Sequence, residues 1–250
     1  MVNRLKKNIN CPMRTKYTHI FFDLDNTLWD FETNSENAMK VACSKFLTEM
    51  IEFDVFFETY AEINHQLWFL YRQNGITKKE LTCRRFQDTF EKLGIEGVNP
   101  EEMNNYYLHV MPDQKLLTKG TIELLDYLKS RFYKMAIITN GFSEVQRKKL
   151  ETSGLNHYFT GVFISEEIKS PKPEKAIFEH ALTSMNARKS QSIMIGDDWE
   201  VDVMGACKFG IDAVYFNVHS VKDIDIQQYE LSVRTKIFKA GNLKELMSFL

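Results

Sequence analysis

Three short polar segments of this chain carry residue types that bind metal ions or phosphate. They are DLDNT at 23–27, ITNG at 138–141 and GDDWEVD at 196–202, and a lysine, Lys172, stands between two prolines. Grouped carboxylates repel one another unless a cation compensates, so we expect a divalent ion among the aspartates. Mg²⁺ fits best, because it takes oxygen ligands, needs few protein carboxylates and commonly bridges to phosphate.

Each segment taken alone has an ordinary structural explanation. DLDNT and ITNG can be simple turns, GDDWEVD can be an acidic helix start, and Lys172 can be an exposed loop lysine. DLDNT also resembles a calcium-binding loop, but Leu28 stands where such a loop needs glycine. The functional interpretation depends on whether the segments converge in space.

Strand and helix signals explain how they could converge. Strand patterns cover 17–22, 133–140, 161–165, 192–197 and 212–217, and helix patterns cover 118–131, 143–154, 172–185, 201–210 and 242–250. This alternation is typical of a parallel doubly wound sheet with helices on both faces. Ligands bind at the carboxyl ends of such strands, where the three polar segments are expected.

A block of helices interrupts the alternation after the first strand. Helix patterns occupy 33–50, 52–75, 77–94 and 99–111, which is too much chain for a simple crossover. The predicted fold class is α/β, a Rossmann-like doubly wound parallel sheet core with an inserted helical cap. The predicted domains are an N-terminal tail at 1–16, a core at 17–30 and 113–250, and a cap at 31–112.

Composition excludes several other classes of protein. The chain has 250 residues, and its 44% of hydrophobic residues is ordinary for a globular protein. Its net charge of −2 gives no basic surface for nucleic acid polymers or anionic membranes. No apolar run approaches the ~20 residues of a membrane span, and no signal-peptide centre is present, so we expect a cytoplasmic protein. The four cysteines match no zinc spacing. Residues 1–12, before Met13, are either a mobile basic tail or an overlong start.

The combined motifs resemble the haloacid dehalogenase superfamily. Its pattern of DxDxT after a strand, a strand-end Thr, an isolated Lys and GDxxxxD matches DLDNT, Thr139, Lys172 and GDDWEVD. Within it, the chain looks like the house-cleaning noncanonical pyrimidine 5'-nucleotidase group. The matching stretches are IITNGF, LETSGL, ISEEI with PKPEKAIF, and the cap pattern LW..Y...GIT with a later RF.

The resemblance implies a mechanism for the core residues. Asp23 would be the nucleophile that forms an aspartyl phosphate, and Asp25 would act as acid and base. The presence of Asp25 favours phosphatase over dehalogenase chemistry, because the dehalogenases of the family lack this second carboxylate. The implied roles are Mg²⁺ binding by Asp23, Asp197 and the Asp25 main-chain carbonyl, outer-shell support from Asp202 and Asp198, phosphate binding by Thr139, Asn140 and Gly141, and charge balance by Lys172.

The resemblance also implies a nucleoside-binding role for part of the cap. The candidates are Trp68, Tyr71, Arg85 and Phe86. Aromatic faces stack on bases, although aromatic residues at helical spacing are more often part of a core.

The leading functional hypothesis is a Mg²⁺-dependent nucleoside 5'-monophosphate phosphohydrolase. A sugar-phosphate or phosphoglycolate phosphatase of the same fold is the alternative. From another class, a phosphoacceptor or non-catalytic binding module would also use an acidic cluster with Thr and Lys, but receiver domains are about half this length and lack the insertion. The expected partner is a small phosphorylated metabolite, and the oligomeric state is left open.

Overall fold

The computed structural model describes residues 16–48, 50–216 and 235–250. The predicted N-terminal tail, apart from Lys16, and the question of whether the chain starts at Met13 lie outside the described residues. No described helix is both long enough and apolar enough to cross a membrane.

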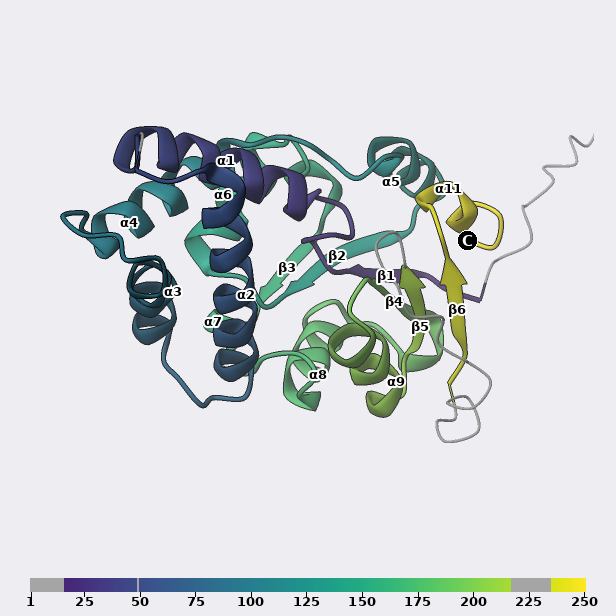
Figure 1. Cartoon of the computed structure of the whole chain (residues 1–250). Coiled ribbons are helices and arrows are strands. Elements are labelled where there is room, and N and C mark those ends of the chain that lie inside the picture. Colours follow the sequence, from purple (N-terminus) through teal and green to yellow (C-terminus); the bar gives the residue numbers. More distant parts are fainter. Residues whose placement is uncertain (1–15, 49, 217–234) are drawn as a thin grey trace, which may run out of the picture.

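The described strands form a six-stranded parallel sheet (Figure 1). They are β1 (His19–Phe22), β2 (Lys134–Thr139), β3 (Gly161–Ile164), β4 (Ser192–Gly196), β5 (Asp212–Phe216) and β6 (Ile237–Ala240), in the spatial order β3-β2-β1-β4-β5-β6. Phe22 is paired with Ile137 of β2 and Ile195 of β4, so the residues that follow β1 and β4 reach the same edge. The predicted α/β fold class is confirmed. Strand β6 was not predicted, because IFKA is short and one of its four residues is a lysine.

Alternating side chains of the strands divide the core between the two faces of the sheet. In β1, Ile20 and Phe22 belong to one buried cluster and Phe21 belongs to the other. The first face packs against α5 (Thr121–Ser130), α6 (Ser143–Thr152) and α11 (Leu243–Leu246), and the second against α8 (Lys175–Ser184) and α9 (Gly205–Phe209). The result is a three-layer arrangement with the sheet in the middle (Figure 1).

In the described part of the chain, four α-helices lie between β1 and α5, within the predicted cap. They are α1 (Phe31–Phe46), α2 (Phe53–Arg72), α3 (Lys78–Leu93) and α4 (Pro100–Val110). Thr77 and Glu80 form a capping box that begins α3, and the left-handed Gly94 ends it. The four helices lie beside the core in Figure 1. The division of the chain into domains at residues 31 and 112 stays a prediction.

Two local departures from the predicted elements position site residues. The helix expected from Lys172 begins at Lys175, which leaves Lys172 in the preceding loop. The helix expected at 201–210 is divided into a π-helical segment, η4 (Trp199–Met204), followed by α9. Because π-helical turns are rare and often lie at functional sites, this irregular turn after β4 is a structural marker for the site.

Candidate active site

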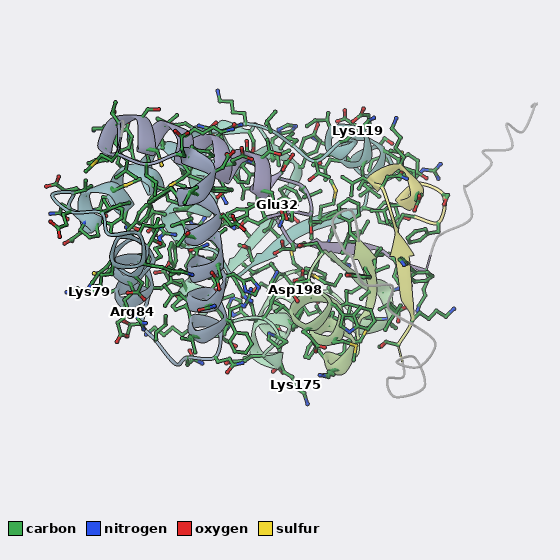
Figure 2. All side chains as sticks on the ribbon, viewed as in Figure 1. Glu32, Lys79, Arg84, Lys119, Lys175 and Asp198 are labelled. Atoms are coloured by element: carbon green, nitrogen blue, oxygen red, sulfur yellow. The ribbon has the colours of Figure 1, made fainter. Side chains whose placement is uncertain are left out.

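A cavity of about 630 Å³ lies at the carboxyl edge of the sheet, with walls from the core and from the cap helices. Glu32 and Asp198, two of its lining residues, lie in the middle of the view in Figure 2, whereas Lys79 and Arg84 lie at the outer edge of the cap. The predicted site residues that line the cavity are Asp23, Asp25, Trp68, Arg85, Thr139, Asn140, Gly141, Lys172, Asp197, Asp198 and Asp202. Tyr71 and Phe86 are not among the lining residues.

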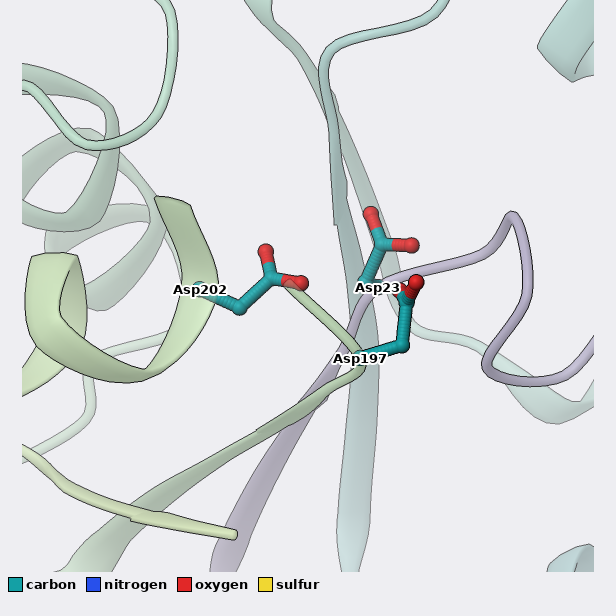
Figure 3. Close-up of side chains that lie close together, drawn as sticks. All are labelled: Asp23, Asp197 and Asp202. Atoms are coloured by element: carbon teal, nitrogen blue, oxygen red, sulfur yellow. The ribbon is translucent and has the colours of Figure 1, made fainter. Parts of the chain in front are cut away.

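Three aspartates form the centre of the cavity floor. Asp23 follows β1, Asp197 follows β4, and Asp202 comes from η4; one carboxylate oxygen of each lies within 4.8 Å of the others (Figure 3). Gly196 makes room for this arrangement, since a Cβ there would lie 2.3 Å from Asp202 Oδ2. The hydroxyl of Thr27 donates to Asp197 Oδ1 at 3.3 Å.

Burial makes these carboxylates costly to ionise. It raises the pKa of Asp23 to about 7, with further contributions from Asp202 and Asp25, although Lys172 opposes the shift. Burial also raises the pKa values of Asp197 and Asp202. A hard cation beside Asp23 and Asp197 would relieve this cost, since carboxylate oxygens are of the type that Mg²⁺ prefers. The cluster therefore fits a divalent metal ion, with Asp202 engaged by Lys172.

Lys172 supplies a cation to this cluster. Its buried ammonium bonds Asp23 and pairs with Asp202 at 2.7 Å. Burial alone would lower the pKa of Lys172, but the charges of Asp202 and Asp23 raise it overall. One ammonium among three carboxylates leaves an excess of negative charge that suits a divalent ion.

The side chain of Asn140 fixes the lysine loop. Its Nδ2 donates to the Lys172 carbonyl at 2.9 Å, and its Oδ1 accepts from the Lys172 backbone N–H at 2.8 Å. The two bonds hold the loop backbone from which the lysine side chain reaches Asp23. The sequence implied phosphate binding by the backbone N–H of Asn140 and left a role for its side chain open, so only the structure shows this positioning contact.

Asp25 is held by two residues of α6 that the sequence interpretation missed. Lys149 Nζ lies 2.6 Å from Asp25 Oδ1, and Gln146 Nε2 donates to Asp25 Oδ2 at 2.9 Å. Lys149 is fully buried, and its ammonium lies 4.1 Å from the ring centroid of Trp29. Burial lowers the pKa of Lys149, although Asp25 opposes the shift. The sequence did carry a signal for this pair, because Gln146 and Lys149 are three positions apart and therefore share one face of the predicted helix.

Gln146 also connects Asp25 to the end of β2. It donates to Thr139 Oγ1 at 2.7 Å, and the backbone N–H of Gly141 donates to the same oxygen at 3.2 Å. Because Thr139 Oγ1 accepts these bonds, its own hydroxyl hydrogen can be donated to a ligand oxygen. A Cβ on Gly141 would lie 2.5 Å from the Gln146 side chain, so this close approach requires glycine.

Asp198 has a local structural role. Its Oδ1 accepts from the backbone N–H groups of Glu200 and Val201 at 3.0 Å and caps η4. Its own backbone N–H donates to Asp202 at 3.2 Å, and its Oδ2 lies 3.9 Å from Arg72 of the cap. Asp198 therefore orients Asp202 and provides a contact between cap and core.

The predicted cap residues differ in position. Trp68 lines the cavity and stacks on Phe142 with ring centroids 5.0 Å apart, and Tyr71 packs against both rings from outside the lining. Phe86 is fully buried and belongs to the aromatic core of the cap. Arg85 lines the cavity while only 2% exposed.

The family model described as haloacid dehalogenase-like hydrolase matches residues 17–210. This match spans β1 to α9 and includes every predicted site residue. The chain belongs to the haloacid dehalogenase-like hydrolases. The resemblance found in the sequence is thereby confirmed.

Similar haloacid dehalogenase-like proteins extend the comparison. The chain is 34% identical to pyrimidine 5'-nucleotidase YjjG of Escherichia coli, over 82% of this chain and 88% of that protein. It is 31% identical to pyrimidine 5'-nucleotidase PynA of Streptococcus pneumoniae, over 83% and 86%. The crystal structure of the putative HAD-hydrolase YfnB from Bacillus subtilis bound to magnesium has a TM-score of 0.81 at 24% identity, covering 93% of this chain and 98% of that one. Family and relatives confirm the predicted enzyme class, a phosphoric monoester hydrolase.

Proposed function

We propose that this enzyme hydrolyses nucleoside 5'-monophosphates with the help of Mg²⁺. The observation that carries the proposal is one cavity in which Asp23 and Asp25 face Thr139 and Lys172 beneath a wall of cap side chains. The nucleotide substrate is supported by the identity to YjjG and PynA, which extends over most of the chain.

In the first step, an Asp23 carboxylate oxygen attacks the phosphorus atom. The phosphorus–oxygen bond to the nucleoside breaks, and Asp25 gives its proton to the departing 5'-oxygen. The products are an aspartyl phosphate and a free nucleoside. Asp25 lies two residues after the nucleophile and is fixed by Gln146 and Lys149, so its position is set before substrate arrives.

In the second step, water replaces the enzyme oxygen. Asp25 accepts a proton from a water molecule whose oxygen attacks the phosphorus, and the bond between phosphorus and Asp23 breaks. Inorganic phosphate leaves and Asp23 is regenerated as a carboxylate. Thr139 donates its hydroxyl hydrogen to a phosphate oxygen, and the Lys172 ammonium limits repulsion between Asp23 and the phosphate.

Asp23 and Asp197 would hold the Mg²⁺, with the Asp25 main-chain carbonyl as the third protein ligand implied by the family pattern. A bound Mg²⁺ neutralises charge on the phosphate oxygens as the phosphoryl group is transferred. Asp202 and Asp198 would act from the outer shell, consistent with their contacts to Lys172 and to each other. A cytoplasmic location stays a prediction.

The test is a substrate panel assayed with and without Mg²⁺. Phosphate release from uridine and thymidine monophosphates, measured beside ribose 5-phosphate and phosphoglycolate, should favour the nucleotides and should stop when the metal is chelated. The Asp23→Asn variant should lose about 10⁴-fold in kcat or more. Robust turnover of the sugar phosphates alone would reject the nucleotide assignment, and full activity of Asp23→Asn would reject the mechanism and admit a phosphate-binding module.

A further inference from the structure

Arg85 is a buried cation whose hydrogen bonds are incomplete. It belongs to α3 of the cap, is 2% exposed, and lines the same cavity as Asp23 and Asp25. Its Nε donates to Asn104 Oδ1 at 2.8 Å, but its Nη2 is buried without a hydrogen-bond partner. Within the described part of the chain, no carboxylate forms an ion pair with Arg85.

Packing compensates only part of this burial. The guanidinium carbon lies 5.2 Å from the ring centroid of Tyr107 and 5.7 Å from that of Phe86, so aromatic faces stabilise the charge. They do not satisfy the free N–H groups on Nη2, and a buried donor without an acceptor is destabilising. An acceptor brought into the cavity by a ligand would remove that cost.

Asn64 presents the complementary atom on the same wall. It lines the cavity, and its Oδ1 is buried without a hydrogen-bond partner. Asn64 lies one turn after Tyr60 on α2, and the Tyr60 ring packs 5.0 Å from Phe86 and 6.0 Å from Tyr107, the two rings beside the guanidinium. The cap wall thus carries an unused donor on Arg85, an unused acceptor on Asn64 and, beside the Arg85 charge, the Tyr60 hydroxyl, which is also buried without a hydrogen-bond partner.

We propose that Arg85 and Asn64 together recognise the amide-like edge of a nucleobase, in which a carbonyl oxygen stands beside an N–H. Arg85 Nη2 donates to the carbonyl oxygen, and Asn64 Oδ1 accepts from the ring N–H. This inference rests on the proposed nucleotide substrate and identifies the residues that select it.

Other leaving groups satisfy this wall less well. A carboxylate, as in phosphoglycolate, would pair with Arg85 but offers Asn64 Oδ1 no donor, and two acceptor oxygens repel one another. A sugar without a base leaves the two cap atoms as unsatisfied as they are without ligand. A site built to hydrogen-bond a substrate group discriminates strongly against analogues that lack it.

The test compares Arg85→Lys with Arg84→Lys as the matched control. Arg84 is the neighbouring arginine on α3, and its side chain points outward to Asp88 at the edge of the cap (Figure 2). The kcat/KM of each variant is measured on uridine 5'-monophosphate, ribose 5-phosphate and phosphoglycolate. We expect Arg85→Lys to lose about 50-fold on the nucleotide and less than about threefold on ribose 5-phosphate, with Arg84→Lys unchanged on all three.

Asn64→Ala provides an independent second variant, because Asn64 is only partly buried and its loss removes no charge. It should lose about tenfold on the nucleotide and leave ribose 5-phosphate unaffected. Parallel losses on all substrates would assign Arg85 and Asn64 to cap structure and overturn the inference. A loss confined to phosphoglycolate would identify a carboxylate subsite and overturn it as well.

The wild-type enzyme separates this inference from the proposed function. A wild type that prefers uridine 5'-monophosphate over ribose 5-phosphate supports the nucleotidase, whatever the cap variants do. If that preference persists unchanged in Arg85→Lys and Asn64→Ala, only the recognition inference fails. If the wild type has no preference for the nucleotide, both fail together.

Discussion

Aspartates at the two ends of the same sheet have pKa values that are shifted in opposite directions. At the carboxyl end, burial raises the pKa values of Asp23, Asp197 and Asp202. At the other end, Asp212 begins β5; burial alone would raise its pKa, but its hydrogen bonds to Lys16, the Lys236 backbone N–H and Tyr17 lower it overall.

The difference lies in the available partners. Asp212 Oδ2 accepts from Tyr17 Oη at 2.7 Å and pairs with Lys16, and its Oδ1 accepts from the Lys236 N–H at 2.9 Å. Of the three site aspartates, Asp23 and Asp202 share the buried ammonium of Lys172, and Asp197 accepts a hydrogen bond from the Thr27 hydroxyl. An aspartate with complete partners stabilises the fold, whereas a crowded cluster keeps binding capacity for a ligand at the expense of stability.

The largest expected effect on stability is a gain in the Asp23→Asn variant when no metal is present. The folded-state pKa of Asp23 is raised to about 7, so its contribution to stability is present below the unfolded pKa and is lost as pH rises through about 7. At about pH 8 the uncharged Asn avoids that loss, and the variant should be more stable by about 2 kcal/mol in urea unfolding. The gap should close near pH 4. If the wild type is instead the more stable protein at pH 8, the burial of Asp23 does not destabilise the fold and the contrast with Asp212 is lost.

Added Mg²⁺ should have the next largest effect, and the effect should grow with pH. Metal and proton compete for the same carboxylate oxygens, so ion binding strengthens as Asp23 deprotonates between about pH 5 and pH 8. At a tenfold excess over its Kd, Mg²⁺ should stabilise the wild type by about 1.4 kcal/mol at the upper pH, visible as a higher Tm. Asp23→Asn serves as the control and should show a smaller increment. If the stabilisation of the wild type by Mg²⁺ does not change with pH, metal and proton do not compete for the Asp23 carboxylate.

The smallest expected effect is the loss from Asp212→Asn, which should have the opposite sign to Asp23→Asn. The folded-state pKa of Asp212 is lowered, so its stabilisation is present above the unfolded pKa of about 3.9 and is lost as pH falls through the folded value. At neutral pH the variant should be destabilised by about 1 kcal/mol, because charge-assisted bonds to Lys16 and Lys236 weaken. Unfolding curves for both proteins should converge at about pH 2 to 3. Equal stability at neutral pH would show that the partners of Asp212 do not stabilise the fold.

Much of the architecture was predictable from local pattern. The alternation of strands and helices, the helical insertion after β1 and the polar residues after β1, β2 and β4 are all local properties of the chain, and parallel strands bring their carboxyl ends to one edge. Strand β6 was missed because four residues that include a lysine give a weak strand signal. The irregular η4 was missed because its carboxylate-rich segment also suits an ordinary helix start.

The supporting contacts of the site were not predictable in the same way. Lys149 looks like any lysine of a charged helix, and only the packing of α6 brings its ammonium to Asp25. Asn140 carries a side chain whose bonds to the Lys172 backbone span 32 positions of the chain. Arg85 was named from the family resemblance, but its unused Nη2 is visible only when all neighbouring acceptors have been placed.

The sequence by itself determined which residue types reach the carboxyl edge of the sheet. Local hydrophobic patterns and turn residues determine where each strand runs and where it ends. Only the tertiary structure decided how those groups are paired, which carboxylates are crowded and which donors and acceptors are left for a ligand. Pairing and burial depend on distances between segments far apart in the chain, and the free energy of an ionised or hydrogen-bonded group is set by those distances.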